Sequence, residues 1–111
     1  MDITLAKIND KVVVVKILGR LDMSAANKLK ETFSEYLKEY KNFVFDCSEM
    51  DFIDSTGLGA FIVCQQSAAK VSGKICIANL QSKPRMLFEI TRAYKIFDVY
   101  DNTKSAIESF E

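Results

Sequence analysis

The segment from Asp54 to Gly59 (D-S-T-G-L-G) holds the residues whose types and spacing are best suited to chemistry. Two adjacent hydroxyl side chains follow an acid and precede two glycines that are spaced by one residue. The following residues predict a helix from about Ser55 to Val71, with Gly73 placed to end it. The hydroxyl groups therefore fall at the N-terminus of a helix, which is electropositive and favours negative charge.

Most enzymatic interpretations of this segment are excluded by residues that are missing. A hydrolase nucleophile elbow needs Gly-x-Ser-x-Gly, but Ile53 occupies the position of the first glycine. The chain contains no histidine, which excludes a Ser-His-Asp or Cys-His mechanism and a histidine metal site within it. A dinucleotide-binding loop would need a third glycine where Ile62 stands, and no Walker lysine follows the glycines. We therefore expect no catalytic residue, cofactor or metal site.

A structural and a regulatory interpretation of the segment remain. Asp54 or Ser55 can cap the helix, but two glycines in the first turn cost about 1 kcal/mol each relative to alanine. Close packing or the approach of a partner would have to offset that cost.

A phosphate on Ser55 would add nearly two negative charges at the helix start. It would join an acidic stretch and repel a partner docked there, because like charges at an interface cost several kcal/mol. The acids are Asp46, Glu49, Asp51 and Asp54.

The elements that must position this segment follow from size and patterning. A chain of 111 residues, 49% of them hydrophobic, suits one folded domain. Fifteen basic residues balance fifteen acidic ones, which is untypical of a protein that binds nucleic acid directly. Hydrophobic periodicity predicts nine elements. They are an opening hairpin of strands 3–8 and 12–18, strands 42–47, 74–78 and 96–100, and helices that begin near residues 22–24, 55, 82 and 103.

This order predicts an α/β fold in which a mixed, mostly parallel sheet with an N-terminal hairpin packs against about four helices. The stretch Gly19–Asp22 (G-R-L-D) is expected to leave the sheet, and Leu58, Phe61 and Ile62 are expected to lie in the core. The three cysteines, Cys47, Cys64 and Cys76, are expected to be buried and reduced. No stretch resembles a signal peptide or is long enough to span a membrane, so we expect a soluble, cytoplasmic protein.

These motifs together resemble the STAS domain family, and specifically the bacterial anti-sigma factor antagonists. The residues D-S-T-G-L-G at 54–59 are similar to the family signature, in which Thr56 replaces a second serine. Gly19–Asp22 is similar to the family's Gly-x-Leu-Asp turn. The segments Leu87–Thr91 and Ile96–Tyr100 resemble its closing helix and strand. The resemblance extends over almost the whole chain and implies one STAS domain over residues 1–111.

The resemblance also implies a function. An unphosphorylated antagonist of this kind binds an anti-sigma factor that is also a serine kinase, and the sigma factor is released. The kinase uses ATP to phosphorylate the first serine of the motif, here Ser55, and the complex dissociates. A PP2C-type phosphatase resets the switch. Such a protein is a binding module and a substrate, not an enzyme, and we expect a monomer or weak dimer.

The implied partner-binding residues are Asp22, Asp54, Ser55, Thr56, Gly57 and Gly59. For the two acids, helix capping is as good an interpretation as a direct role. For the two glycines, close contact with the kinase and close packing on the sheet both remain open. Thr56 is a candidate minor site, and Arg20 is better explained as a solvated loop residue than as a contact for partner or phosphate.

Other roles of STAS domains remain as alternatives. STAS domains also occur as cytoplasmic tails of anion transporters, as parts of stressosome scaffolds and as small subunits of lipid-transport complexes. The lack of membrane spans and of a sensor domain disfavours the transporter and the usual stressosome architecture. A scaffold or regulatory subunit of a stressosome or lipid-transport complex is the main alternative. An enzyme that binds small molecules or hydrolyses nucleotides is the weakest.

Overall fold

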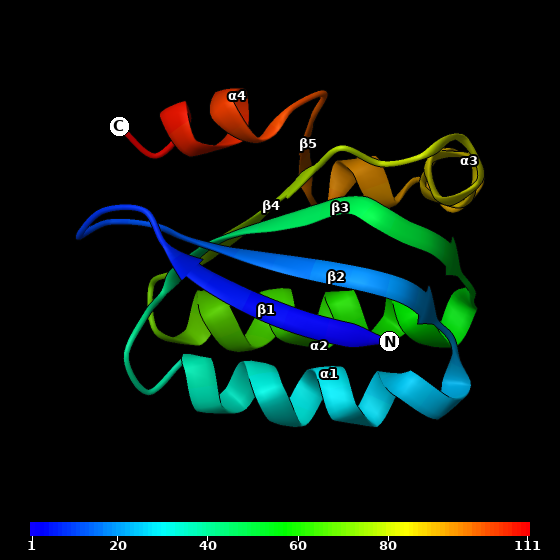
Figure 1. Ribbon diagram of the computed structural model, residues 1–111, viewed down its shortest axis with the longest axis horizontal. Helices are drawn as coiled ribbons and strands as arrows, with labels where there is room; N and C mark the ends of the chain where they lie inside the picture. The colour runs from blue at the N-terminus through cyan, green and yellow to red at the C-terminus, as the bar shows by residue number, and fades with distance from the viewer.

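A five-stranded sheet forms the centre of the computed structural model, which describes residues 1–111 (Figure 1). The first two strands are antiparallel and all other neighbouring strands are parallel. The strands follow one another across the sheet in chain order. They are β1 (Asp2–Lys7), β2 (Val13–Leu21), β3 (Asn42–Ile53), β4 (Lys74–Ala78) and β5 (Asp98–Tyr100). This arrangement confirms the predicted mixed, mostly parallel sheet with an N-terminal hairpin.

Four α-helices cover the sheet. They are α1 (Met23–Tyr36), α2 (Ser55–Lys70), α3 (Ser82–Ile90) and α4 (Thr103–Glu108), and a 3₁₀ turn η1 (Ala93–Lys95) precedes β5. Figure 1 shows α1 and α2 side by side on one face, α4 on the opposite face, and α3 beside the end of β3. Because β2 and β3 are parallel neighbours, α1 and α2 both begin at the same edge of the sheet. None of these helices has the length and apolar composition needed to cross a membrane.

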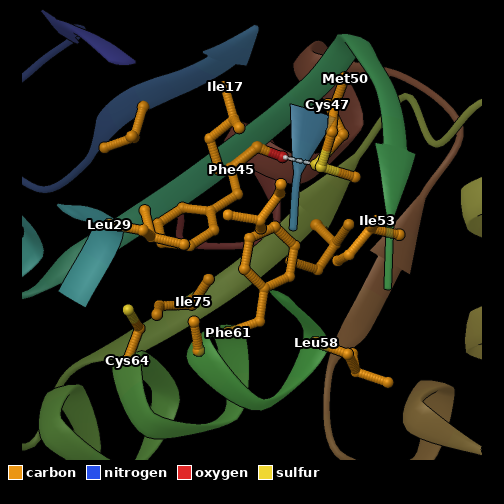
Figure 2. Packing of buried hydrophobic residues seen from close by; sticks show 14 of the residues in the cluster. Ile17, Leu29, Phe45, Cys47, Met50, Ile53, Leu58, Phe61, Cys64 and Ile75 are labelled. Carbon is orange, nitrogen blue, oxygen red and sulfur yellow. Dashed lines mark hydrogen bonds between the residues drawn. The ribbon is translucent and has the colours of Figure 1, made fainter. Parts of the chain in front are cut away.

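The main core lies between the sheet and helices α1 and α2 (Figure 2). Its centre is a chain of phenylalanine rings that links α1 to α2 through β3. The Phe45 ring lies 5.7 Å from that of Phe33 and 5.2 Å from that of Phe61, in edge-to-face arrangements that stabilise aromatic pairs. Leu58 and Phe61 are buried as predicted, and Ile62 is partly buried against the same cluster.

The three cysteines are buried and unpaired, as predicted. Burial raises the pKa of the Cys64 thiol to about 12, and it also raises the pKa values of Cys47 and Cys76. The Cys47 thiol donates a hydrogen bond to the Phe45 carbonyl over 3.6 Å, shown as the dashed line in Figure 2. These thiols therefore serve as small core residues rather than as nucleophiles.

The two central strands are longer than the sequence pattern predicted. We expected strands to end near Leu18 and Cys47, but β2 continues to Leu21 and β3 to Ile53. Gly19–Asp22 therefore does not leave the sheet until after Leu21. Gly19 adopts a φ of +88°, and the strand register shifts there, so the extension is irregular. Helices α1 and α2 start directly after the extended parts of β2 and β3, so the extension determines where both helices begin.

Other boundaries also differ from the predictions. Helix α2 ends at Lys70, and Ser72 rather than Gly73 adopts the left-handed conformation, with a φ of 62°. Gly73 is required for a different reason, because a Cβ there would lie 2.0 Å from the Lys41 carbonyl oxygen. The last strand begins at residue 98 rather than 96, because η1 ends at Lys95 and its C-cap, Ile96, still has helical backbone angles.

Candidate functional site

The candidate site lies where β2 and β3 end side by side. Leu21 and Ile53 are register partners, so the next residues, Asp22 and Asp54, leave the sheet at neighbouring positions. The Asp54 amide donates to the Leu21 carbonyl over 3.4 Å, which joins the two strand ends. Each of these two acids is the N-cap of the helix that follows. The fold therefore places the starts of α1 and α2 next to each other.

Asp22 is held by contacts within the chain. Its Oδ1 accepts hydrogen bonds from the Ser24 amide (3.0 Å) and the Ser24 hydroxyl (2.6 Å). The hydroxyl donor is the main reason that the pKa of Asp22 lies below its usual value. The Arg20 Nε lies 3.8 Å from Oδ2, and the Arg20 guanidinium stacks 3.9 Å from the centre of the Phe52 ring. The capping interpretation of Asp22 is confirmed, and Arg20, although exposed, contacts both Asp22 and the Phe52 ring.

Asp54, and not Ser55, caps helix α2. The Asp54 carboxylate accepts a hydrogen bond from the Gly57 amide over 2.8 Å, in the usual geometry of a helix N-cap. Ser55 is the first residue of the helix, and its exposed hydroxyl makes no hydrogen bond within the chain. Thr56 is exposed as well. The Ser55 hydroxyl is therefore free for a reaction or contact that the fold does not use.

The two glycines of the motif occupy different environments. A Cβ on Gly57 would lie 2.2 Å from the Leu21 carbonyl oxygen, so only glycine allows the first turn of α2 to pack on the end of β2. A Cβ on Gly59 would meet nothing within 4 Å. Close packing explains Gly57 completely. It does not explain Gly59, which costs helix stability without any contact in return.

The outward face of α2 beside Ser55 is uncharged. From Ser55 to Ala69 the helix contains no charged residue, and its single charge is Lys70 at the end. The side chain of Val63 is exposed on this helix, and Met23 is exposed at the start of neighbouring α1. Our sequence reasoning did not identify Met23 or Val63. The absence of charge along a surface helix is a signal that could have indicated Val63.

The edge where α1 and α2 begin carries hydroxyl and carboxylate side chains. The residues contain no cluster of His, Cys, Asp or Glu that could hold a metal ion. Both nearby carboxylates, Asp22 and Asp54, are occupied as helix caps. A cavity of about 530 Å³ lies elsewhere, between the β1–β2 turn and the α1–β3 loop, where Val12 and Tyr40 line it. Ser55 does not line this cavity and lies on the exposed surface.

Comparisons with known proteins show the family to which this chain belongs. The STAS domain family profile matches residues 4–106. The anti-sigma-B factor antagonist of Listeria monocytogenes is 31% identical over 84 residues, covering 75% of this chain and 74% of the relative. The anti-sigma-B factor antagonist of Bacillus subtilis is 26% identical over 102 residues, covering 92% of this chain and 94% of the relative.

Solved structures show the same fold. A putative anti-sigma factor antagonist from Thermotoga maritima superimposes with a TM-score of 0.89 at 23% identity, covering 97% of this chain and 93% of that one. Phosphorylated SpoIIAA from Bacillus gives a TM-score of 0.75 at 18% identity, covering 99% of this chain and 100% of that one. From the family profile and the Listeria relative, we conclude that this chain belongs to the STAS domain family, among the anti-sigma factor antagonists.

Proposed function

We propose that the unphosphorylated chain binds an anti-sigma factor with serine kinase activity over Ser55, and that phosphorylation of Ser55 ends the complex. The observation that carries this proposal is the state of the Ser55 hydroxyl. It is exposed at the first position of α2 and has no hydrogen bond within the chain, while the capping role belongs to Asp54. A kinase can reach this oxygen without breaking any contact of the fold.

The modification is a phosphoryl transfer from ATP. The Ser55 Oγ forms a bond to the γ-phosphorus, the bond from that phosphorus to the bridging oxygen of ADP breaks, and ADP leaves. The hydroxyl proton must pass to a base on the kinase, because no group of this chain accepts a hydrogen bond from Ser55. The chain thus acts as a substrate, and the catalytic machinery belongs to the partner.

The fold should tolerate the phosphate, whereas the complex should not. At the first position of a helix, the phosphate faces the free backbone N–H groups and the positive end of the helix dipole. A partner surface over the same position meets nearly two added negative charges beside Asp51 and Asp54. Like charges brought together at an interface cost several kcal/mol, and about 2.8 kcal/mol weakens binding a hundredfold.

The other residues of the site have supporting roles in this proposal. Asp22 and Asp54 hold the starts of α1 and α2 in place, and Gly59 leaves room for the backbone of the partner above α2. Thr56 lies beside the acceptor and extends the uncharged surface. A phosphatase of the PP2C type would remove the phosphate and restore binding. The Bacillus protein SpoIIAA, which has the same fold, has been solved in both unphosphorylated and phosphorylated forms, and this supports a two-state cycle.

The test is complex formation with and without ATP. Wild type, Ser55→Ala and the matched control Thr56→Ala are mixed with candidate anti-sigma kinases from the same genome and separated by size-exclusion chromatography. We expect all three to form a complex without ATP, and only Ser55→Ala to keep it when ATP is added. Equal ATP sensitivity of Ser55→Ala and wild type would contradict the proposal. A stable wild-type complex that ATP never dissociates would instead favour a scaffold or a regulatory subunit of a larger assembly.

A further inference from the structure

Helix α3 and the turn after it expose a concentration of apolar side chains. Eight large apolar side chains of this protein are exposed, and four of them lie between residues 86 and 96. Met86 and Ile90 are four residues apart and share one face of α3. We call the four the α3 patch; they are Met86 (59% exposed), Ile90 (74%), Tyr94 (52%) and Ile96 (48%). Exposed apolar clusters mark interaction sites.

The opposite face of α3 already supplies the contacts that hold the helix in place. Pro84 and Phe88 are buried. The Phe88 ring lies 6.3 Å from that of Phe61 and 6.0 Å from that of Phe97, within the main core. The exposure of Met86 and Ile90 is therefore not needed for packing α3 on the sheet.

Free positive charge surrounds the α3 patch. Between residues 83 and 96 the chain has four basic residues and one acid, Glu89, although its total charge is zero. Arg85 pairs with Asp101 over 3.4 Å, but the other three bases are exposed and form no ion pair. These three are Lys83, Arg92 and Lys95. A matching surface must therefore be acidic as well as apolar.

The start of α3 lies at the same end of the molecule as Ser55. The Gln81 side chain, just before α3, donates to the Ser48 carbonyl of β3 over 2.9 Å. Asp51 of β3 and Lys83 of α3 line one shallow hollow, and Asp51 precedes Ser55 by four residues. Figure 1 shows α3 beside the end of β3, where α2 begins. Helix α3 and the start of α2 are therefore both adjacent to the end of β3.

We infer that the α3 patch is a second contact for the anti-sigma factor that binds over Ser55, and that it receives an acidic, apolar surface of that partner. This inference rests on the proposed function. The two contacts differ in charge, because the face of α2 beside Ser55 is uncharged and unpaired bases surround the patch, so the partner fits in one orientation. A second copy of this chain is a poorer occupant, because a symmetric dimer through the patch would bring two basic surfaces together.

The experiment measures steady-state phosphorylation of the full chain by the anti-sigma kinase. The variants are Ile90→Asp and the double charge reversal Lys83→Glu/Lys95→Glu. Matched controls are Ile8→Asp and Lys11→Glu, at exposed positions of the β1–β2 turn at the other end of the sheet. We expect KM to rise at least tenfold in both α3 variants with kcat unchanged within twofold, and no change in the controls. Added NaCl should raise KM less in the charge-reversed variant than in wild type.

The outcomes separate this inference from the proposed function. Normal KM values in both α3 variants would overturn the second contact while leaving phosphorylation of Ser55 in place. A wild-type complex that forms without phosphorylation of Ser55 would overturn the switch. The dissociation constants of the same variants would then decide the α3 contact, with a tenfold loss supporting it and no loss overturning it. Failure of the wild type to bind any anti-sigma factor of its genome would overturn both.

Discussion

The Cα of Gly57 faces the Leu21 carbonyl oxygen so closely that a Cβ there would lie 2.2 Å from that atom. This relationship joins the first turn of α2 to the end of β2 and leaves no room for any larger residue. Gly59, two residues later, has open space where its Cβ would be. The two glycines of one motif therefore have separate physical roles, and substituting each of them tests a different part of the account.

Gly57→Ala and Gly59→Ala should change stability in opposite directions. The alanine at 57 meets a backbone atom, so we expect a loss of about 1–3 kcal/mol in the free energy of unfolding. The alanine at 59 meets nothing and removes the entropic cost of glycine in a helix, so we expect a gain of up to about 1 kcal/mol. Urea unfolding followed by circular dichroism measures both. If Gly59→Ala is more stable but binds the anti-sigma factor as well as wild type, the proposed approach of the partner at Gly59 is wrong.

Ser55→Ala should leave stability almost unchanged. Because Asp54 supplies the cap and the Ser55 hydroxyl has no partner, we expect a change within about 0.5 kcal/mol. Asp54→Ala should cost about 1 kcal/mol, since it removes the hydrogen bond to the Gly57 amide. Asp51→Ala, an exposed acid of the same stretch, serves as the control. A larger loss in Ser55→Ala than in Asp54→Ala would mean that the cap has been assigned to the wrong residue.

Asp22 should make stability depend on pH in the acid range. Its carboxyl has a pKa below the usual value of about 3.9, because the charged form accepts hydrogen bonds from Ser24. Its contribution is therefore complete above the unfolded-state pKa and is lost as the pH falls through the lower folded-state pKa. Asp22→Asn keeps a cap but cannot titrate. We expect wild type to lose more stability than Asp22→Asn between pH 5 and pH 2, as measured by urea midpoints, and equal losses would contradict this origin.

The cysteines should resist modification in the folded protein. All three are buried, and burial raises the pKa of Cys64 to about 12, so little thiolate exists near pH 8. We expect no reaction with a thiol-specific disulfide reagent within minutes at pH 8, and reaction of three thiols per chain after unfolding in urea. Rapid labelling of one thiol in the native protein would show that the core around that residue opens.

Much of the fold and part of the site could be predicted from the sequence, for identifiable reasons. Strand β4 was predicted at its observed bounds because K-I-C-I-A is an isolated apolar run. The ends of β2 and β3 were missed because the polar residues Arg20 and Glu49 interrupt the hydrophobic pattern, while pairing between the strands continues past them. Strand pairing is a long-range property, and a local pattern does not report it.

The same limit applies to the site, where local preferences could be predicted from the sequence and contacts between elements could not. The capping preference of aspartate indicated Asp22 and Asp54, but the choice between Asp54 and Ser55 needed the hydrogen bond to Gly57. The different roles of Gly57 and Gly59 depend on the position of Leu21, which lies 36 residues earlier in the chain than Gly57. Neither contact can be read from spacing within the motif.

Phosphopeptide mapping is the measurement that tests the central claim most directly. The chain is incubated with ATP and each candidate anti-sigma kinase, digested, and analysed by mass spectrometry, with Ser55→Ala and Thr56→Ala as paired controls. The account predicts phosphate on Ser55 in wild type and Thr56→Ala, none in Ser55→Ala, and dissociation of the complex as the phosphate accumulates. A complex that persists with Ser55 unmodified, or that dissociates through phosphate on another residue, would contradict it.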